Sequence, residues 1–237
     1  MSQKPVLESA GLDGWIVRLF ETIDEDNLPW LSALSRRCEQ AFGSALIDLV
    51  PSYTTLLVVF DPITLSSSEA RAMICQILVD LEPDSGVQDG QVHELPTWYD
   101  ISVGPDLPRV AEHTGMAVTD VIEVHSQRTY RVFALGFAPG FAFKGLIDPR
   151  LECPRLDTPR QRVPAGSVAL AGRQTAAYPT ETPGGWNLLG RTSARLFDRR
   201  REGFSLLRVG DQVRFVSVSR ETFEREGGSS TPMGRES

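Results

Sequence analysis

Between Arg155 and Arg173 the sequence places four arginines against one acidic residue, in a chain with a formal net charge of −7. The planar guanidinium group donates several hydrogen bonds and suits carboxylate or phosphate groups. Arg160 lies between two prolines, which would hold its backbone in a fixed shape. We therefore predict that Arg160 and Arg173 bind an anionic ligand. The alternative is that these arginines are surface groups paired with nearby acids, namely Asp148, Glu152 and Asp157.

Neutral and aromatic side chains near these arginines would complete such a site. Gln174, Thr175 and Tyr178 supply neutral hydrogen-bond donors, and the Gly184-Gly185 pair would let the backbone approach a ligand closely. Two aromatic residues, Phe141 and Trp186, would form its walls. A few polar groups among aromatic rings are typical of a site for a small molecule.

His125 is a further candidate, at the C-terminal end of a short helix that the sequence predicts from Thr119 or Asp120 to Val124. The helix dipole there favours a charged imidazole and would raise its pKa, so His125 could bind an anion or handle a proton. The alternative is a histidine that only caps the last carbonyl groups of the helix. We predict no metal site, because the three histidines and three cysteines lack the spacing of metal ligands.

The composition narrows the classes of function. The acidic balance disfavours nucleic acid or an anionic membrane as the main partner. No apolar run approaches 18 residues, so we expect a soluble, cytoplasmic protein. The chain also lacks the GxxxxGK[ST] and GxSxG motifs, and no cysteine has a motif-linked histidine. The catalytic apparatus is therefore unorthodox or shared with another chain.

Periodicity predicts an N-terminal α+β domain over residues 12–100, after a loose leader in residues 1–13. Its elements follow the order β-α-β-β-α-β, the split βαβ (ferredoxin-like) arrangement of a four-stranded sheet covered by two helices. Ser66 and Glu69 form a capping box that starts the second helix. The four predicted strands cover residues 15–20, 45–50, 54–60 and 91–99.

The rest of the chain predicts a helical connector over residues 101–127 and a mainly-β domain over residues 128–218. Residues 136–190 hold seven of the sixteen prolines and eight of the twenty glycines, which favours short strands joined by tight turns. Such strands suggest a closed or nearly closed barrel. Residues 219–237, rich in Glu, Arg, Gly and Ser, predict a flexible tail.

Several short motifs follow one another in this second domain: GFAPGFAF at 136–143, TPRQRVPAGSV at 158–168, AGRQT at 171–175, YP at 178–179, PGGW at 183–186 and GRT at 190–192. With them the chain resembles the KipI-type family, which includes the B component of 5-oxoprolinase and is also called allophanate hydrolase subunit 1. The resemblance covers about residues 12–217. It implies a cyclophilin-like β-barrel similar to part of the carboxyltransferase region of urea carboxylases. Phe143 stands where the family often has tyrosine, so that hydroxyl is missing here.

The resemblance implies an ATP-dependent hydrolase subunit that helps open the lactam of 5-oxo-L-proline to L-glutamate and is inactive without its partners. These partners are a larger, family-related subunit and a third hydrolase subunit. ATP would be bound by this chain or by the partner, with magnesium as a candidate counter-ion. His125 and Arg160 would be catalytic. Substrate contacts or the subunit seam would come from Arg173, Gln174, Thr175, Tyr178, Pro139, Gly140, Phe141, Gly184, Gly185 and Trp186.

Two alternatives follow from the same family. One branch inhibits a sensor histidine kinase, which would make this chain a regulatory binding protein without chemistry of its own. The other is allophanate hydrolysis, but the serine-rich amidase segment expected for that reaction is missing from this sequence.

Overall fold

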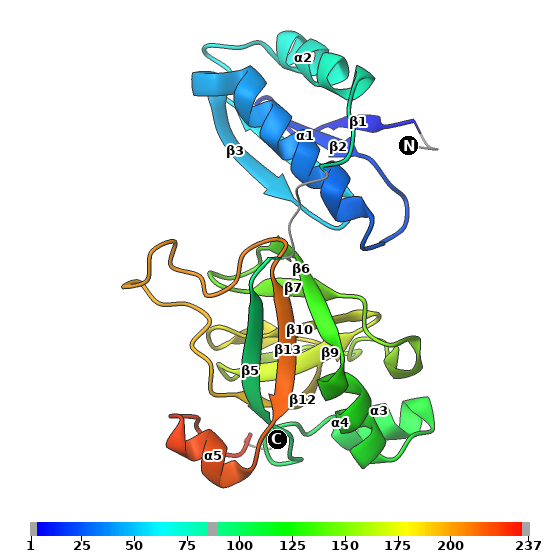
Figure 1. Ribbon diagram of the computed structural model, residues 1–237, viewed down its shortest axis with the longest axis vertical. Coiled ribbons are helices and arrows are strands. Elements are labelled where there is room, and N and C mark those ends of the chain that lie inside the picture. The colour runs from blue at the N-terminus through cyan, green and yellow to red at the C-terminus, as the bar shows by residue number, and fades with distance from the viewer. Residues whose placement is uncertain (1–3, 85–89, 234–237) are drawn as a thin grey trace. The chain divides into compact units, whose positions relative to one another are not determined.

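The computed structural model describes residues 4–84 and 90–233 (Figure 1). The chain divides into two compact units, residues 1–88 and 89–237. Among the described residues, no helix has both the length and the apolar character that crossing a membrane requires. The first unit contains a sheet with two helices, and the second contains a closed barrel.

The N-terminal unit is an antiparallel sheet in the order β1-β2-β4-β3, with α1 and α2 packed on it. The core between helices and sheet holds Leu34 and Cys38 of α1 together with Val58 and Phe60 of β4. The capping box is confirmed, because Ser66 accepts from the Glu69 N–H and Glu69 accepts from the Ser66 N–H. The elements are β1 (Val6–Ser9), β2 (Gly14–Arg18), α1 (Asn27–Phe42), the 3-10 helix η1 (Gly43–Ala45), β3 (Leu46–Pro51), β4 (Thr55–Phe60) and α2 (Ser67–Val79).

The split βαβ arrangement is not confirmed, because the strand predicted for residues 91–99 lies elsewhere. This strand is β5 (Val92–Trp98), and it pairs in parallel with β13 (Gln212–Ser217) in the barrel. The sheet edge beside β2 is instead occupied by β1, which lies in the segment predicted as a loose leader. Alternation along a strand reports which side chains are buried but not which strand lies beside it, so pattern alone could not make this assignment.

The second unit is a seven-stranded closed barrel in the order β10-β7-β6-β13-β5-β12-β9, which confirms the predicted barrel (Figure 1). The pair β5–β13 is parallel, and the other pairs around the barrel are antiparallel. A two-stranded sheet, β8 with β11, accompanies it. The remaining strands are β6 (Thr129–Leu135), β7 (Ala142–Gly145), β8 (Arg160–Val163), β9 (Ser167–Ala171), β10 (Gln174–Ala177), β11 (Thr182–Gly184) and β12 (Asn187–Thr192).

The predicted connector forms two helices, α3 (Leu107–Thr114) and α4 (Val118–Gln127), that belong to the barrel unit. Val110 of α3 and Val121 of α4 share one apolar core with Leu170 of β9 and Phe215 of β13. A 3-10 helix, η2 (Pro149–Leu151), adds Leu151 to this core.

Part of the segment that was predicted as a flexible tail forms a helix. Residues 220–225 form helix α5 (Arg220–Arg225), whose N-cap Ser219 accepts a hydrogen bond from the Thr222 N–H. Phe223 is fully buried and packs with Trp98 of β5 at a ring-centroid distance of 5.7 Å. One buried aromatic residue thus anchors a segment whose average composition is polar. Residues 234–237 lie outside the described residues.

Candidate functional site

A pocket of about 360 Å³ opens in the barrel unit and is lined mainly by aromatic rings. It contains five of the residues that the sequence analysis singled out, which are Phe141, Tyr178, Gly184, Gly185 and Trp186. The other lining residues are Phe137, Phe143, Arg155, Pro159 and Pro183. The site is therefore built from β7 and the loop before it, from the segment before β8, and from β11 with the segments on either side of it.

Phe141 is the centre of the aromatic wall. Its ring lies 4.8 Å from that of Phe143, 5.3 Å from that of Tyr178 and 6.0 Å from that of Trp186, measured between centroids, always edge to face. Edge-to-face pairs hold aromatic rings in defined orientations. The wall is therefore a preorganised apolar surface.

Phe137 lies against this wall, and pattern reasoning did not select it. Its side chain is 64% exposed, and its backbone φ is 68°, a region that residues other than glycine rarely adopt. Its ring makes an edge contact with Phe141 at 5.2 Å. An exposed ring held on strained backbone beside a pocket is typical of a ligand-contacting residue. The signal in the sequence was its place inside the GFAPGF motif.

Pro139 and Gly140 shape the loop without lining the pocket. A Cβ atom on Gly140 would lie 2.8 Å from the Cβ of Phe197 and 3.0 Å from the Leu196 carbonyl oxygen, so only glycine fits there. The loop closes through a hydrogen bond from the Gly136 N–H to the Phe141 carbonyl, 3.1 Å long. Gly140 and this hydrogen bond therefore position the loop that carries Phe137 and Phe141.

Tyr178 brings a hydroxyl group to the aromatic pocket. A Cβ atom on Gly184 would lie 2.3 Å from this hydroxyl oxygen, so glycine is needed for the two segments to approach. A phenol hydroxyl can donate one hydrogen bond, so Tyr178 offers the pocket a donor. Burial raises the pKa of Tyr178 to about 12, so the hydroxyl stays neutral at ordinary pH.

Arg155 is the charged residue that lines the pocket. Its guanidinium lies 5.7 Å from the centroid of the Trp186 ring, at cation–π distance. Arg155 was part of the arginine-rich segment, but the predicted anion-binding residues were Arg160 and Arg173. The structure does not place either of those two among the lining residues.

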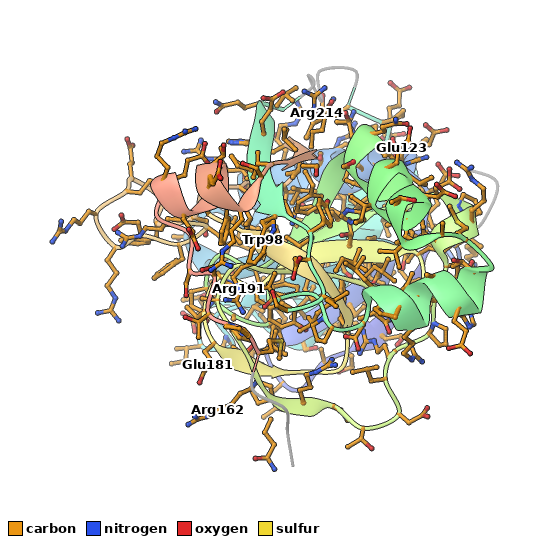
Figure 2. All side chains as sticks on the ribbon, turned by 90° about the horizontal axis from the view of Figure 1, so that it is seen from below. Trp98, Glu123, Arg162, Glu181, Arg191 and Arg214 are labelled. Carbon is orange, nitrogen blue, oxygen red and sulfur yellow. The ribbon has the colours of Figure 1, made fainter. Side chains whose placement is uncertain are left out.

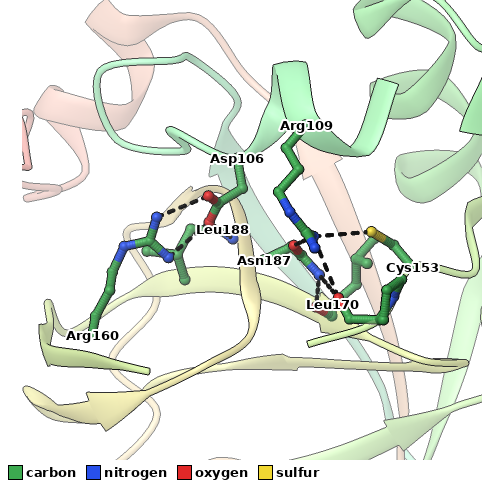
Figure 3. Close-up of polar contacts among 8 residues, drawn as sticks. Asp106, Arg109, Cys153, Arg160, Leu170, Asn187 and Leu188 are labelled. Atoms are coloured by element: carbon green, nitrogen blue, oxygen red, sulfur yellow. Dashed lines mark hydrogen bonds and ion pairs between the residues drawn. The ribbon is translucent and has the colours of Figure 1, made fainter. Parts of the chain in front are cut away.

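Arg160 is instead engaged in a bidentate ion pair (Figure 3). Its Nη1 donates to Asp106 Oδ2 at 2.9 Å and its Nη2 to Asp106 Oδ1 at 2.8 Å. Asp106 Oδ2 also accepts from the Leu188 N–H at 2.7 Å. The guanidinium fork therefore joins β8 to the residue that precedes α3, and Asp106 in turn joins both to β12.

The other polar candidates are dispersed. Arg173 is exposed in the turn between β9 and β10, and its carbonyl accepts from the Ile147 N–H. Gln174 begins β10 and is half-buried. Thr175 is buried, and its Oγ1 donates to the Ala169 carbonyl at 3.0 Å. None of the three belongs to the lining of the aromatic pocket.

His125 is fully buried in the last turn of α4, and the predicted rise of its pKa is wrong. Burial, together with the positive charge of Lys144, lowers the pKa of His125 to about 3. Desolvation of the imidazolium therefore outweighs the helix dipole, which acts mainly at exposed helix ends. The imidazole is neutral at ordinary pH.

Two hydrogen bonds fix the orientation of the His125 ring. Tyr99 Oη lies 2.8 Å from Nδ1, and Thr175 Oγ1 lies 2.9 Å from Nε2. Because Thr175 already donates to a carbonyl, it accepts from Nε2–H, and the hydroxyl of Tyr99 then donates to Nδ1. Both ring nitrogens are satisfied within the protein. The ring also stacks on Phe215 at 4.9 Å between centroids.

Lys144 is buried near His125, and the sequence analysis did not single it out. It is fully buried in β7, and its Nζ donates to the Ala142 carbonyl at 3.1 Å. Burial lowers the pKa of Lys144 to about 7. The ammonium group also lies 5.6 Å from the centroid of the Phe215 ring. A single lysine in an otherwise apolar strand was the signal that could have drawn attention to it.

The described residues offer poor support for a bound metal, and the aromatic pocket offers poor support for a bound triphosphate. Residues 4–84 and 90–233 contain no group of three or more His, Cys, Asp or Glu side chains that could hold a metal ion. The aromatic pocket has one guanidinium and mostly apolar walls, whereas a triphosphate requires several donors around each phosphate. The pocket therefore suits a small, singly charged, partly apolar molecule, and ATP does not fit it.

Comparison with known proteins agrees with this architecture. Residues 5–207 match the family described as "Carboxyltransferase domain, subdomain C and D". The chain is 34% identical over 233 residues to the B component of 5-oxoprolinase from Bacillus subtilis, covering 94% of this chain and 97% of that one.

Solved structures show the same fold. A protein called TTHA0988 is 38% identical, with a TM-score of 0.75 over 88% of this chain, but the match spans only 40% of that longer chain. The urea carboxylase of Kluyveromyces lactis has a TM-score of 0.79 at 18% identity, over 93% of this chain and 22% of that chain. The last similarity concerns the fold alone. The present chain belongs to the carboxyltransferase domain, subdomain C and D, family.

Proposed function

We propose that this chain is one subunit of an ATP-dependent 5-oxoprolinase, which opens 5-oxo-L-proline to L-glutamate. The relative from Bacillus subtilis is named as the B component of 5-oxoprolinase and matches almost from end to end. The aromatic pocket carries the proposal further, because its size and chemistry suit a five-membered lactam with one carboxylate.

Each part of such a substrate has a counterpart in the pocket. The apolar ring would lie against the wall formed by Phe141 and Trp186, and Arg155 would neutralise the carboxylate. The neutral hydroxyl of Tyr178 would donate to the lactam carbonyl, whose oxygen gains negative charge as the amide bond is broken. These three contacts bind, orient and polarise the substrate without a nucleophile from this chain.

We assign the remaining chemistry to partner subunits. The aromatic pocket lacks the donors that a triphosphate requires, so ATP and any magnesium counter-ion would be held by another chain. In TTHA0988, the longer relative, about three fifths of the chain lies outside the match, which is consistent with further domains beside this one. We therefore expect the isolated chain to bind the substrate but not to turn it over.

Reconstitution of the complex tests this proposal. The purified chain is mixed with its partner subunits, ATP and 5-oxo-L-proline, and glutamate and ADP are measured. Product from the full mixture, and none when this chain is omitted, is the expected result. If the complete mixture yields no glutamate but the chain binds the dimerisation domain of a histidine kinase, the regulatory function is correct instead.

Substitution of Tyr178 tests the proposed contact to the carbonyl. Tyr178→Phe keeps the ring and removes the hydroxyl, so kcat should fall by about 10- to 100-fold while KM changes little. Tyr130→Phe is the matched control, since this buried hydroxyl donates to the His125 carbonyl at 2.8 Å, away from the pocket. Equal kcat values for the two variants would show that the Tyr178 hydroxyl does not act on the substrate.

A further inference from the structure

Arg191 of β12 is a buried cation that the proposed function does not use. Its side chain lies within the fold, whereas Arg162 and Glu181 project at the margin (Figure 2). Its Nη1 donates to the carbonyl oxygens of Ser229 at 2.7 Å and Thr231 at 2.9 Å. Within residues 4–84 and 90–233, its Nε and Nη2 have no hydrogen-bond partner, although Arg191 is only 3% exposed. Buried, unpaired guanidinium nitrogens are costly, so their presence calls for an explanation.

A second unpartnered group lies directly beside Arg191. Ser167 of β9 is opposite Arg191 in the β9–β12 register and is fully buried, and its Oγ has no partner among the described residues. Ser167 and Ala169 are two positions apart, so their side chains lie on one face of β9. Ala169 belongs to the apolar cluster of the aromatic pocket, together with Phe141 and Tyr178. Arg191 and Ser167 are therefore on the sheet face that forms the pocket.

The segment of residues 229–233, which we call the C-terminal strap, covers this position. Its contacts with Arg191 are made by two backbone carbonyls rather than by a carboxylate. Its Met233 packs against the same apolar cluster of the pocket, and the Met233 N–H donates to the Ser102 carbonyl at 2.9 Å. The strap thus contacts both the cation and the cluster, yet it leaves two guanidinium nitrogens and one hydroxyl unpaired.

We propose that Arg191 and Ser167 form a binding site for the carboxylate of a small molecule, and that the C-terminal strap occupies this site in the free protein. A carboxylate offers about four acceptor positions and could pair with the nitrogens and hydroxyl that the strap leaves unsatisfied. The strap must leave before the ligand enters, so the apparent affinity is reduced by the fraction of molecules in which it is closed. This site adds to the proposed function and does not depend on it.

Methyl NMR of the full-length chain, labelled at methionine, tests the proposal directly. The probes are cyclopentanecarboxylate, 5-oxo-L-proline and the neutral 5-oxo-L-prolinamide. A carboxylate should move the Met233 methyl resonance toward its position in unstructured peptides, because the strap is displaced, while the neutral amide should not. An unchanged Met233 resonance at saturating concentrations of both carboxylates would overturn the proposal.

Two substitutions separate the site from the strap. Arg191→Gln should weaken carboxylate binding by about 10-fold or more, whereas Arg162→Gln, at an exposed arginine, should not. Met233→Ser should tighten binding by about 5-fold because it loosens the strap, and Met73→Ser in the N-terminal unit is its control. If Arg191→Gln fails to fold, the Met233→Ser comparison still decides, since unchanged affinity there would contradict the strap.

The probe panel also keeps this proposal distinct from the proposed function. Binding of cyclopentanecarboxylate through Arg191, without binding of 5-oxo-L-proline, would support the site and count against the 5-oxoprolinase assignment. Binding of 5-oxo-L-proline that is insensitive to Arg191→Gln would do the reverse, since the substrate would then use the aromatic pocket alone.

Discussion

The cluster around His125 and the aromatic pocket around Phe141 lie in the same unit and are built from similar groups. In the His125 cluster, both ring nitrogens have partners within the protein, and the Tyr130 hydroxyl donates to a carbonyl. In the pocket, the Tyr178 hydroxyl retains a proton to donate, and Phe137 exposes an aromatic ring. Satisfied hydrogen bonds and a closed environment indicate a structural role, whereas available donors beside an open cavity indicate binding.

Removing His125 is the strongest test of this contrast. His125→Ala leaves a cavity and deprives the Tyr99 hydroxyl and Thr175 Oγ1 of their partner, so the free energy of unfolding should fall by about 4 kcal/mol. Urea denaturation measures this change, and His113→Ala, at an exposed histidine, should be nearly neutral. If His125→Ala is as stable as His113→Ala but abolishes turnover of the complex, His125 is catalytic and the contrast fails.

The buried lysine of the same cluster predicts a pH dependence. Because the pKa of Lys144 in the folded chain, about 7, lies below the ordinary value of 10.5, the unfolded chain binds more protons between these values. Stability should therefore rise between about pH 7 and pH 10.5, by up to about 1.4 kcal/mol per pH unit for this one proton. Lys144→Met should remove this slope and stabilise the protein at pH 6 by about 2 kcal/mol.

Urea denaturation at several pH values checks the lysine prediction. The His125 imidazole provides an internal reference, since its pKa of about 3 makes stability fall only as the pH drops from about 6.5 toward 3. The two windows do not overlap. A slope above pH 7 that persists in Lys144→Met would show that another group causes it.

What the sequence could and could not reveal follows from the distance between interacting residues along the chain. Phe141, Tyr178 and Trp186 all line the pocket, and each lies in a glycine- or proline-containing motif that is visible in the sequence. The ion pair of Arg160 was not predicted because its partner, Asp106, is 54 residues away and not visible in any local pattern. The same limit explains why strand Val92–Trp98 was assigned to the wrong sheet. Its partner in the barrel, β13, lies about 120 residues further along the chain.

Buried polar residues were the hardest to interpret. The expectation for His125 used only its position at a helix end, and the opposing effect of desolvation depends on the strands that enclose it. Burial of Phe223 likewise depends on Trp98, so composition alone indicated a tail where a helix forms. Charge and composition are properties of the segment itself. Its burial and the pKa values of its side chains depend on segments that are distant along the chain.

The smallest change in stability that we expect belongs to a pair of substitutions that tests the pocket separately from the rest of the fold. Phe137 and Phe204 are both exposed phenylalanines with positive φ, 68° and 61°. Glycine adopts this conformation without strain, so Phe137→Gly and Phe204→Gly should each change the free energy of unfolding by no more than about 1 kcal/mol. Only Phe137 lines the pocket, and its ring contacts Phe141.

Phe137→Gly should therefore lower kcat/KM of the assembled complex by about 10-fold, while Phe204→Gly leaves it unchanged. Steady-state kinetics with 5-oxo-L-proline and thermal unfolding of both variants provide the measurement. Because the two substitutions are matched in residue type, exposure and backbone strain, general destabilisation would lower both rates together. A selective loss in Phe137→Gly can arise only from the pocket, and equal rates would mean that the strained ring at its edge does not contact the substrate.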